Sequence, residues 1–219
     1  SRLHAEDDRA GFAATLDWGF RMALLLGVPA SVALFVLAVP LVATVFLHGE
    51  MTTPDATMAA RALQAFALGL PALVVAKIAA PGFFARQDTR TPFHYATVSV
   101  SVNVVASLAL FSWLAHIGLA LATSIAAVVN GVLLVSGLLR RGDYAPTSAL
   151  RRIIIVVLVA SAVMAAVLEW LVPGETVWLR TDISSRVWML SAAVLGGGAL
   201  YVFVAFLMGV RARDLRHRV

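Results

Sequence analysis

The chain has 219 residues, of which 61% are hydrophobic and only 13% are charged, and its formal net charge is +5. A soluble domain carries roughly 25% charged residues, so this composition excludes a single water-soluble core and indicates an integral membrane protein. The absence of cysteine excludes a disulfide framework and thiolate metal sites. The arginines stand in short blocks between long uncharged runs, as in membrane loops. They form no basic face typical of nucleic-acid binding, so we expect no nucleic-acid partner.

Six segments are long enough to cross a membrane, since a spanning helix needs about 20 apolar residues. All six are continuously apolar, without the alternation typical of barrel strands. The predicted fold class is therefore an all-α integral membrane protein with six transmembrane helices. The third and fourth helices share one uncharged run, which we expect to turn at His116-Ile117-Gly118. The predicted spans are 18–47, 61–85, 92–115, 118–139, 150–172 and 186–210.

The arginines also predict the orientation, because short cytoplasmic loops carry an excess of basic residues. Arg61, Arg180 and Arg186 fall on one side of the predicted spans. The other side is far richer in arginine, so we expect both ends of the chain to be cytoplasmic. Its arginines are Arg2, Arg9, Arg86, Arg90, Arg140, Arg141, Arg151, Arg152, Arg211, Arg213, Arg216 and Arg218.

Lys77 is the only lysine and stands inside the second span, four residues before Pro81-Gly82, where we expect the helix to break. An ammonium group at membrane depth is costly and therefore indicates a function. Pro81 has no N–H, so the Lys77 carbonyl loses its partner within the helix. Two interpretations remain open. Lys77 belongs to a polar cavity or a network that stabilises the lobe, or its side chain extends to the cytoplasmic headgroups.

Two charged clusters flank the first two spans. Arg86, Asp88 and Arg90 form the short loop after the second span, where Asp88 is placed to cap or lock the turn. We expect this loop to be a cytoplasmic latch rather than a substrate contact. Asp17 and Arg21 lie one helical turn apart, and we expect a surface pair that sets the depth of the first helix.

Neutral oxygens recur in the third and fourth spans. Asn103 and Ser107 lie one turn apart, and Thr123 lies early in the next helix. If these faces meet, they offer hard ligands for a small cation, or they are hydrogen-bonding residues that join two helices. The five histidines have no metal-ligand spacing and no catalytic motif is present, so we expect neither a cofactor nor an enzyme.

Three sequence segments carry a family resemblance: LDWGFRMALLLGVPASVAL at 16–34, VVAKIAAPGFFARQDTRTP at 74–92 and GLALATS at 118–124. They resemble the bacterial lipid II flippase family MurJ, also called MviN, of the MOP exporter superfamily. The resemblance implies the C-terminal portion of a fourteen-helix, two-lobed transporter whose first eight helices are missing here. The chain also begins at Ser1 without an initiator methionine or a secretory leader, so we expect a piece of a longer protein.

The resemblance implies that two parts of the chain have different roles. Residues 1–141 would form a cytoplasmic lead-in and four helices of the C-terminal lobe. Residues 142–219 would form the last two helices, with an apolar groove for a polyprenyl tail, and a basic cytoplasmic tail. Some family members bind Na⁺ through an Asn, a carboxylate one turn later and a Thr in the next helix. Asn103 and Thr123 match that pattern, but Ser107 replaces the carboxylate, so coupling to Na⁺ or to the membrane potential stays open.

The function implied by the resemblance is the transfer of lipid II, the undecaprenyl-pyrophosphate-linked peptidoglycan precursor, across the bacterial inner membrane by alternating access. The implied partners are lipid II, membrane lipids and the missing N-terminal helices. Three alternatives remain: a flippase for another lipid-linked oligosaccharide, a MATE-like antiporter, and a membrane scaffold that transports nothing. An enzyme acting on polyprenyl phosphates would need acidic metal-binding motifs, which the sequence lacks.

Overall fold

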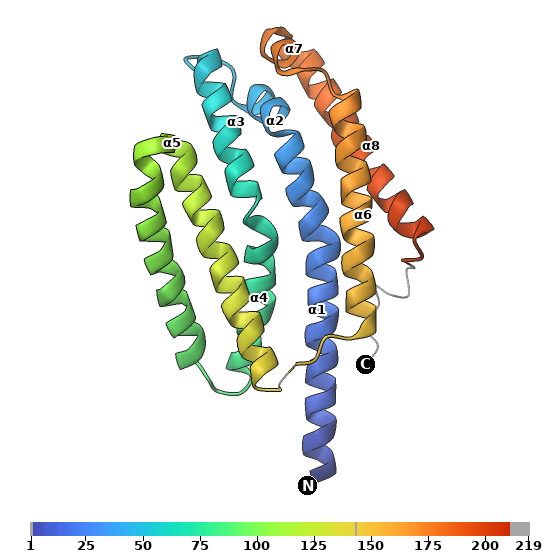
Figure 1. Ribbon diagram of the computed structural model, residues 1–219. Helices are drawn as coiled ribbons and strands as arrows, with labels where there is room; N and C mark the ends of the chain where they lie inside the picture. The colour runs from blue at the N-terminus through green and yellow to red at the C-terminus, as the bar shows by residue number, and fades with distance from the viewer. Residues whose placement is uncertain (1, 143, 211–219) are drawn as a thin grey trace.

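The computed structural model describes residues 2–142 and 144–210, and for residues 2–10 only the backbone. All regular structure in these ranges is α-helical, and the long helices run side by side (Figure 1). The predicted basic tail at 211–219 lies outside the described residues. The helices are α1 (Arg2–Val36), α2 (Ala38–Val45), α3 (Thr53–Ala67), α4 (Leu70–Phe84), α5 (Arg90–Arg140), α6 (Ser148–Leu171), α7 (Glu175–Arg180) and α8 (Ile183–Leu207).

Six passes are confirmed in the described part of the chain. Five helical segments are long and apolar enough to cross a membrane, and one of them contributes two passes. That helix is α5, which folds back at Ala115 (φ 47°, ψ −124°) into two antiparallel legs, visible as the green hairpin in Figure 1. The turn lies one residue before the predicted His116-Ile117-Gly118. Position 118, just after the turn, requires glycine, because a Cβ there would lie 2.6 Å from the Leu110 carbonyl oxygen.

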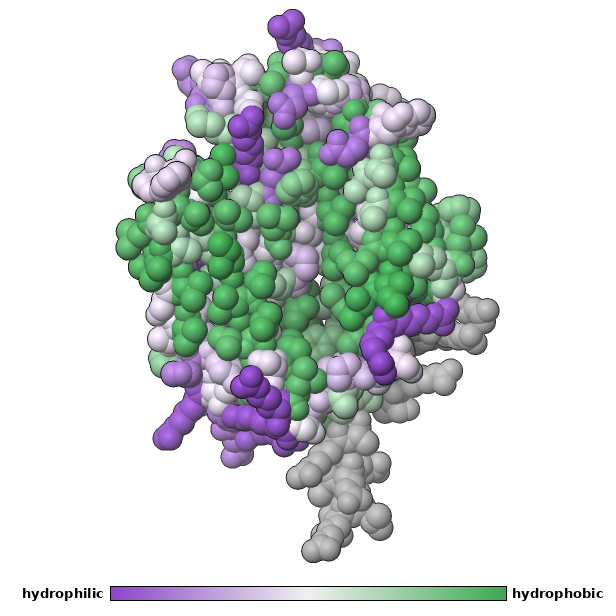
Figure 2. All heavy atoms as spheres, in the orientation of Figure 1, coloured by the Kyte–Doolittle hydropathy of each residue, from purple (hydrophilic) through white to green (hydrophobic). Residues whose placement is uncertain are grey.

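The surface has the polarity of a membrane-spanning bundle. On the face shown in Figure 2, a broad belt of apolar side chains separates two polar ends. Large apolar side chains such as Leu108, Leu195 and Phe206 are exposed on the surface of the bundle. Inside the bundle, α6 packs on α1 through Leu25, Ile153 and Val157, and α8 contacts α1 through Tyr201. Whether residue 141 separates two functional units stays a prediction.

The predicted helix break at Pro81-Gly82 is wrong. Helix α4 continues through Pro81 to Phe84, because Gly82 and Phe83 are buried against the second leg of α5 at Leu138. The break in this pass lies instead at Leu68-Gly69, between α3 and α4. Gly69 is required there, because a Cβ would lie 2.6 Å from the Ser124 Cα.

Serine hydroxyl groups satisfy the carbonyl groups that this break releases. Pro71 has no N–H to offer the Ala67 carbonyl, which accepts a hydrogen bond from the buried Ser31 hydroxyl of α1 at 2.5 Å instead. Ser124, from the second leg of α5, donates to the Ala65 carbonyl at 2.6 Å. Irregular backbone at membrane depth is tolerated only where protein or water satisfies it. The break therefore holds three passes together.

The same arrangement recurs at Pro29 inside α1. The Leu25 carbonyl, four residues earlier, lacks its partner within the helix and accepts a hydrogen bond from the Tyr201 hydroxyl of α8 at 2.8 Å. The break between α1 and α2 is bridged similarly, because the Gln64 amide donates to the Phe35 carbonyl at 3.1 Å. Pro29 and Pro71 thus determine where hydroxyl groups of other passes bind.

We predict that Tyr201→Phe lowers the free energy of unfolding by about 1–2 kcal/mol, since it leaves the Leu25 carbonyl without a partner. The loss should shrink in the Pro29→Ala background, where residue 29 supplies an N–H to that carbonyl. Equilibrium unfolding of the detergent-solubilised protein measures all four members of this cycle, with Tyr95→Phe as the matched control. Equal losses in both backgrounds would contradict the assignment.

Candidate functional site

Lys77 lines a cavity of about 530 Å³ between α4 and the two legs of α5. Its side chain is exposed. Most of the wall is apolar, and the other polar residues on it are Thr89 and Asn130. The Asn130 Oδ1 atom is buried without a hydrogen-bond partner. The only lysine of the chain therefore lies beside a cavity wall that also carries an unsatisfied amide oxygen.

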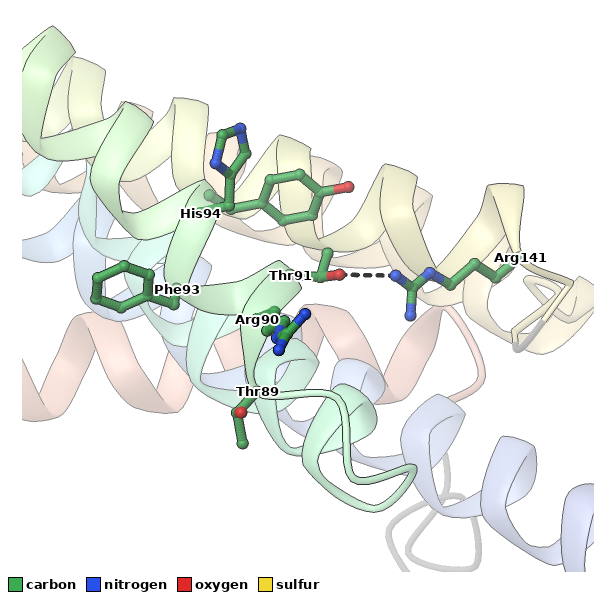
Figure 3. A pocket seen from close by; sticks show the side chains of 7 residues that line it. Thr89, Arg90, Thr91, Phe93, His94 and Arg141 are labelled. Atoms are coloured by element: carbon green, nitrogen blue, oxygen red, sulfur yellow. Dashed lines mark hydrogen bonds between the residues drawn. The ribbon is translucent and has the colours of Figure 1, made fainter.

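The loop after α4 is closed by an ion pair with the far end of α5. The Asp88 carboxylate accepts hydrogen bonds from the Thr91 backbone N–H at 3.0 Å and the Thr91 hydroxyl at 2.7 Å. Arg141 Nη1 lies 2.6 Å from Asp88 Oδ2. Arg141 Nη2 donates to the Thr91 hydroxyl at 2.7 Å, the hydrogen bond that is dashed in Figure 3. The Arg141 guanidinium also stacks on the Phe83 ring, 5.2 Å from its centre.

The predicted members of the latch therefore play different parts. Asp88 makes the contacts that close the loop, while the side chains of Arg86 and Arg90 are exposed around it. Arg141 was not among the predicted latch residues, because the α5 hairpin brings it back beside a loop 53 positions away in sequence. The sequence shows only that residues 86–90 and 140–141 are both basic segments. A latching function of this loop stays a proposal.

The ionisation of Asp88 follows from these contacts. Hydrogen bonds from Thr91, and then the contact with Arg141, lower the pKa of Asp88 from 3.8 to about 2. Each of these donors stabilises the charged carboxylate more than the neutral acid. Asp88 is consequently ionised over the whole physiological range.

Asn103, Ser107 and Thr123 do come together within the α5 hairpin. The Asn103 amide lies 3.4 Å from the Thr123 hydroxyl, and the Ser107 hydroxyl lies 3.4 Å from Asn103 Oδ1. Thr123 donates in turn to the Leu119 carbonyl at 3.0 Å. These contacts join the two legs at membrane depth. Among the described residues, no group of three or more His, Cys, Asp or Glu side chains could hold a metal ion.

Asp17 is not the surface residue that its sequence position predicts. Its side chain is 3% exposed and accepts hydrogen bonds from the Tyr144 hydroxyl at 2.9 Å and the Thr147 hydroxyl at 2.9 Å. Arg21 Nε completes the cluster at 3.1 Å. Burial and the contact with Asp17 raise the pKa of Tyr144. The expected pair with Arg21 exists, but the loop between α5 and α6 covers it, because Thr147 also begins α6 as its N-terminal cap.

An apolar groove of about 540 Å³ lies between α6, α7 and α8. Leu168, Leu171, Met189 and Leu200 contribute to its walls, and Trp178 lies at one end. Gly197 permits this spacing, because a Cβ there would lie 3.1 Å from the Leu168 side chain. The buried Arg186 supports the same region, donating to the Ala43 carbonyl of α2 at 2.9 Å and to the Leu179 carbonyl of α7 at 3.3 Å.

Comparison with known proteins identifies the family. The family model described as "Lipid II flippase MurJ" matches residues 1–210. The chain is 38% identical over 217 residues to a probable lipid II flippase MurJ of Vibrio cholerae, covering 99% of this chain and 41% of that protein. It is 33% identical over 219 residues to lipid II flippase MurJ of Burkholderia cenocepacia, covering 100% of this chain and 42% of that protein. The chain belongs to the lipid II flippase MurJ family.

The fold agrees with this assignment. A solved structure described as lipid II flippase MurJ, inward closed conformation, matches with a TM-score of 0.78 at 25% sequence identity, over 95% of this chain and 41% of that one. The resemblance to the MurJ family and the multi-pass membrane fold are thereby confirmed. The chain spans about 41% of the length of the MurJ relatives that it matches.

The lowered pKa of Asp88 predicts how acid acts on the closed loop. A carboxyl whose folded pKa is lowered stabilises the fold above its unfolded pKa, and this contribution is lost as the pH falls. The loss should occur between about pH 4 and pH 2. We predict that Asp88→Asn melts at a lower temperature than wild type at pH 7, and that this difference narrows toward pH 2.

Thermal unfolding in detergent at several pH values measures this effect. Glu50→Gln, which neutralises an exposed carboxylate at the other end of the bundle, is the control. A difference between Asp88→Asn and wild type that stays constant from pH 7 to pH 2 would contradict the role of the Asp88 charge.

Proposed function

We propose that this chain is the C-terminal portion of a lipid II flippase of the bacterial inner membrane, working by alternating access. The observation that carries the proposal is the match to the MurJ family over residues 1–210, together with the matching fold. Because the chain spans only about 41% of its relatives, we propose that upstream helices of the same protein complete the transport path. Its partners would be those helices, lipid II and the surrounding lipids.

Lys77 is the residue of this chain that we assign to the transport path or to a network that stabilises the lobe. It supplies an ammonium group at the wall of a cavity that is otherwise almost entirely apolar. A cation in apolar surroundings attracts phosphate groups strongly, because little water competes for it. Asn130, with its unsatisfied Oδ1 atom in the same wall, is the acceptor that we propose for such a network.

We assign the polyprenyl tail to the groove between α6 and α8. Its walls are aliphatic and aromatic, as a hydrocarbon chain requires. Gly196 on α8 leaves room for a hydrocarbon chain to lie against the helix, because no atom lies within 4 Å of the position of a Cβ there. The charged headgroup would then bind elsewhere in the complete protein.

We further propose that the arginine-rich end of the bundle is cytoplasmic, where the loop that carries Arg86, Asp88 and Arg90 would act as a latch. The basic segments at 86–90, 140–141 and 151–152 all belong to this end. Energy would come from the membrane potential or from an ion gradient. Asn103, Ser107 and Thr123 form a neutral set that is joined by hydrogen bonds, so a Na⁺ site there would need further ligands.

Rescue of bacteria depleted of their own flippase tests the function. The complete open reading frame that carries this chain is expressed in them, and exposure of lipid II on the outer face of the inner membrane is measured. We expect restored exposure and growth. Normal membrane expression without rescue would contradict lipid II transport and favour another lipid-linked oligosaccharide or a scaffold.

We predict that Lys77→Ala reduces rescue at least tenfold, while Lys77→Arg retains part of it, because arginine keeps the charge in the cavity. The melting temperature separates the two roles. It stays near the wild-type value if Lys77 acts in the transport path, and it falls if Lys77 stabilises the lobe. Rescue by Lys77→Ala at the wild-type level would mean that the lysine only extends toward the headgroups.

A further inference from the structure

Two cavities of opposite character meet at the loop between α4 and α5. One, of about 750 Å³, is lined by polar and basic residues at the loop itself. The other is the largely apolar cavity of about 530 Å³ beside Lys77. Both are lined by Thr89 and Phe93, so they share a wall. Together they make one amphipathic surface that runs from the loop along the apolar faces of α4 and α5.

The basic cavity brings together two arginines from the start and the end of α5. Arg90, His94 and Arg141 line it, together with the Thr91 hydroxyl and Tyr95 (Figure 3). Among the described residues, Asp88 is the carboxylate beside this group, and Arg141 Nη1 lies 2.6 Å from Asp88 Oδ2. Arg90 is exposed and adds a positive charge that Asp88 does not offset. The charge of the described side chains here is therefore positive, which favours an anion.

The apolar cavity continues from Phe93 along the helices. Leu73, Ala80, Phe84, Ala96 and Leu134 provide most of its wall. Phe93 is 74% exposed and Phe84 is 51% exposed, so both present aromatic surface to whatever fills the space. A free inorganic anion would gain no binding free energy from these apolar walls. An acyl chain would gain it, because the chain would bury apolar surface against them.

We propose that these two cavities bind one anionic phospholipid of the bilayer, as a bound lipid distinct from the transported substrate. Its phosphate lies against Arg90 and Arg141, and one acyl chain lies past Phe93 in the apolar cavity. Basic pockets between membrane helices recognise anionic headgroups in this way. The lipid contacts both ends of α5 and the loop that Asp88 closes, so it links the closure of this loop to the composition of the leaflet.

Native mass spectrometry of the complete, detergent-solubilised protein tests the proposal without requiring transport. The probes are phosphatidylglycerol, the zwitterionic phosphatidylcholine with the same chains, and inorganic phosphate. We expect phosphatidylglycerol to bind more tightly than phosphatidylcholine. Arg90→Gln should weaken phosphatidylglycerol binding about fivefold, since a basic residue near a membrane surface contributes about 1 kcal/mol. Arg180→Gln, which removes an exposed arginine from the other end of the bundle, should leave it unchanged.

A second variant tests the part of the site that would bind the acyl chain. Ala96→Phe places a ring in the apolar cavity at an exposed helical position and should displace the lipid without changing any charge. Equal phosphatidylglycerol binding by wild type, Arg90→Gln and Ala96→Phe would overturn the proposal. Displacement of the lipid by millimolar inorganic phosphate would overturn it too, because the site would then recognise a free anion. Either result is independent of whether the protein rescues a flippase-depleted strain.

Discussion

Backbone carbonyl groups released at helix irregularities must find hydrogen bonds, and this constraint organises the bundle. In the apolar interior of a membrane an unsatisfied carbonyl costs several kcal/mol. Pro29 releases the Leu25 carbonyl, which the Tyr201 hydroxyl satisfies. Pro71 releases the Ala67 carbonyl, which the Ser31 hydroxyl satisfies. Each proline thereby specifies a contact with another pass.

These contacts tie together passes that are distant in sequence. Tyr201 joins the last helix to the first across 176 positions, and Ser124 joins the α5 hairpin to the break between α3 and α4. Arg186 acts similarly, donating to carbonyl groups near the ends of α2 and α7. Apolar packing alone gives little direction in a membrane, because lipid chains are as apolar as the side chains. Polar contacts of this kind therefore decide which helix faces meet.

At the arginine-rich end, the contacts that join the helices are made by charged side chains rather than by released carbonyl groups. Asp88 with Arg141 closes the loop between α4 and α5, and Asp17 with Thr147 holds the connection from α5 to α6 on α1. The cavity lined by Lys77 and the groove between α6 and α8 remain open between these joined elements. A bundle built this way is joined at its polar contacts and keeps apolar space between the joined elements.

Composition and arginine placement were sufficient to predict an all-α membrane protein with six passes, since span length and charge are local properties of the chain. The motifs around Pro81 and Gly118 were sufficient for the family. The position of the helix break was not predictable, because Gly82 packs against Leu138 while Gly69 meets Ser124, and both neighbours are distant in sequence. Arg141 as the partner of Asp88 and the burial of Asp17 likewise depend on how the α5 hairpin folds back. Only tertiary structure brings such residues together, because the energy of a buried polar group depends on its neighbours in space.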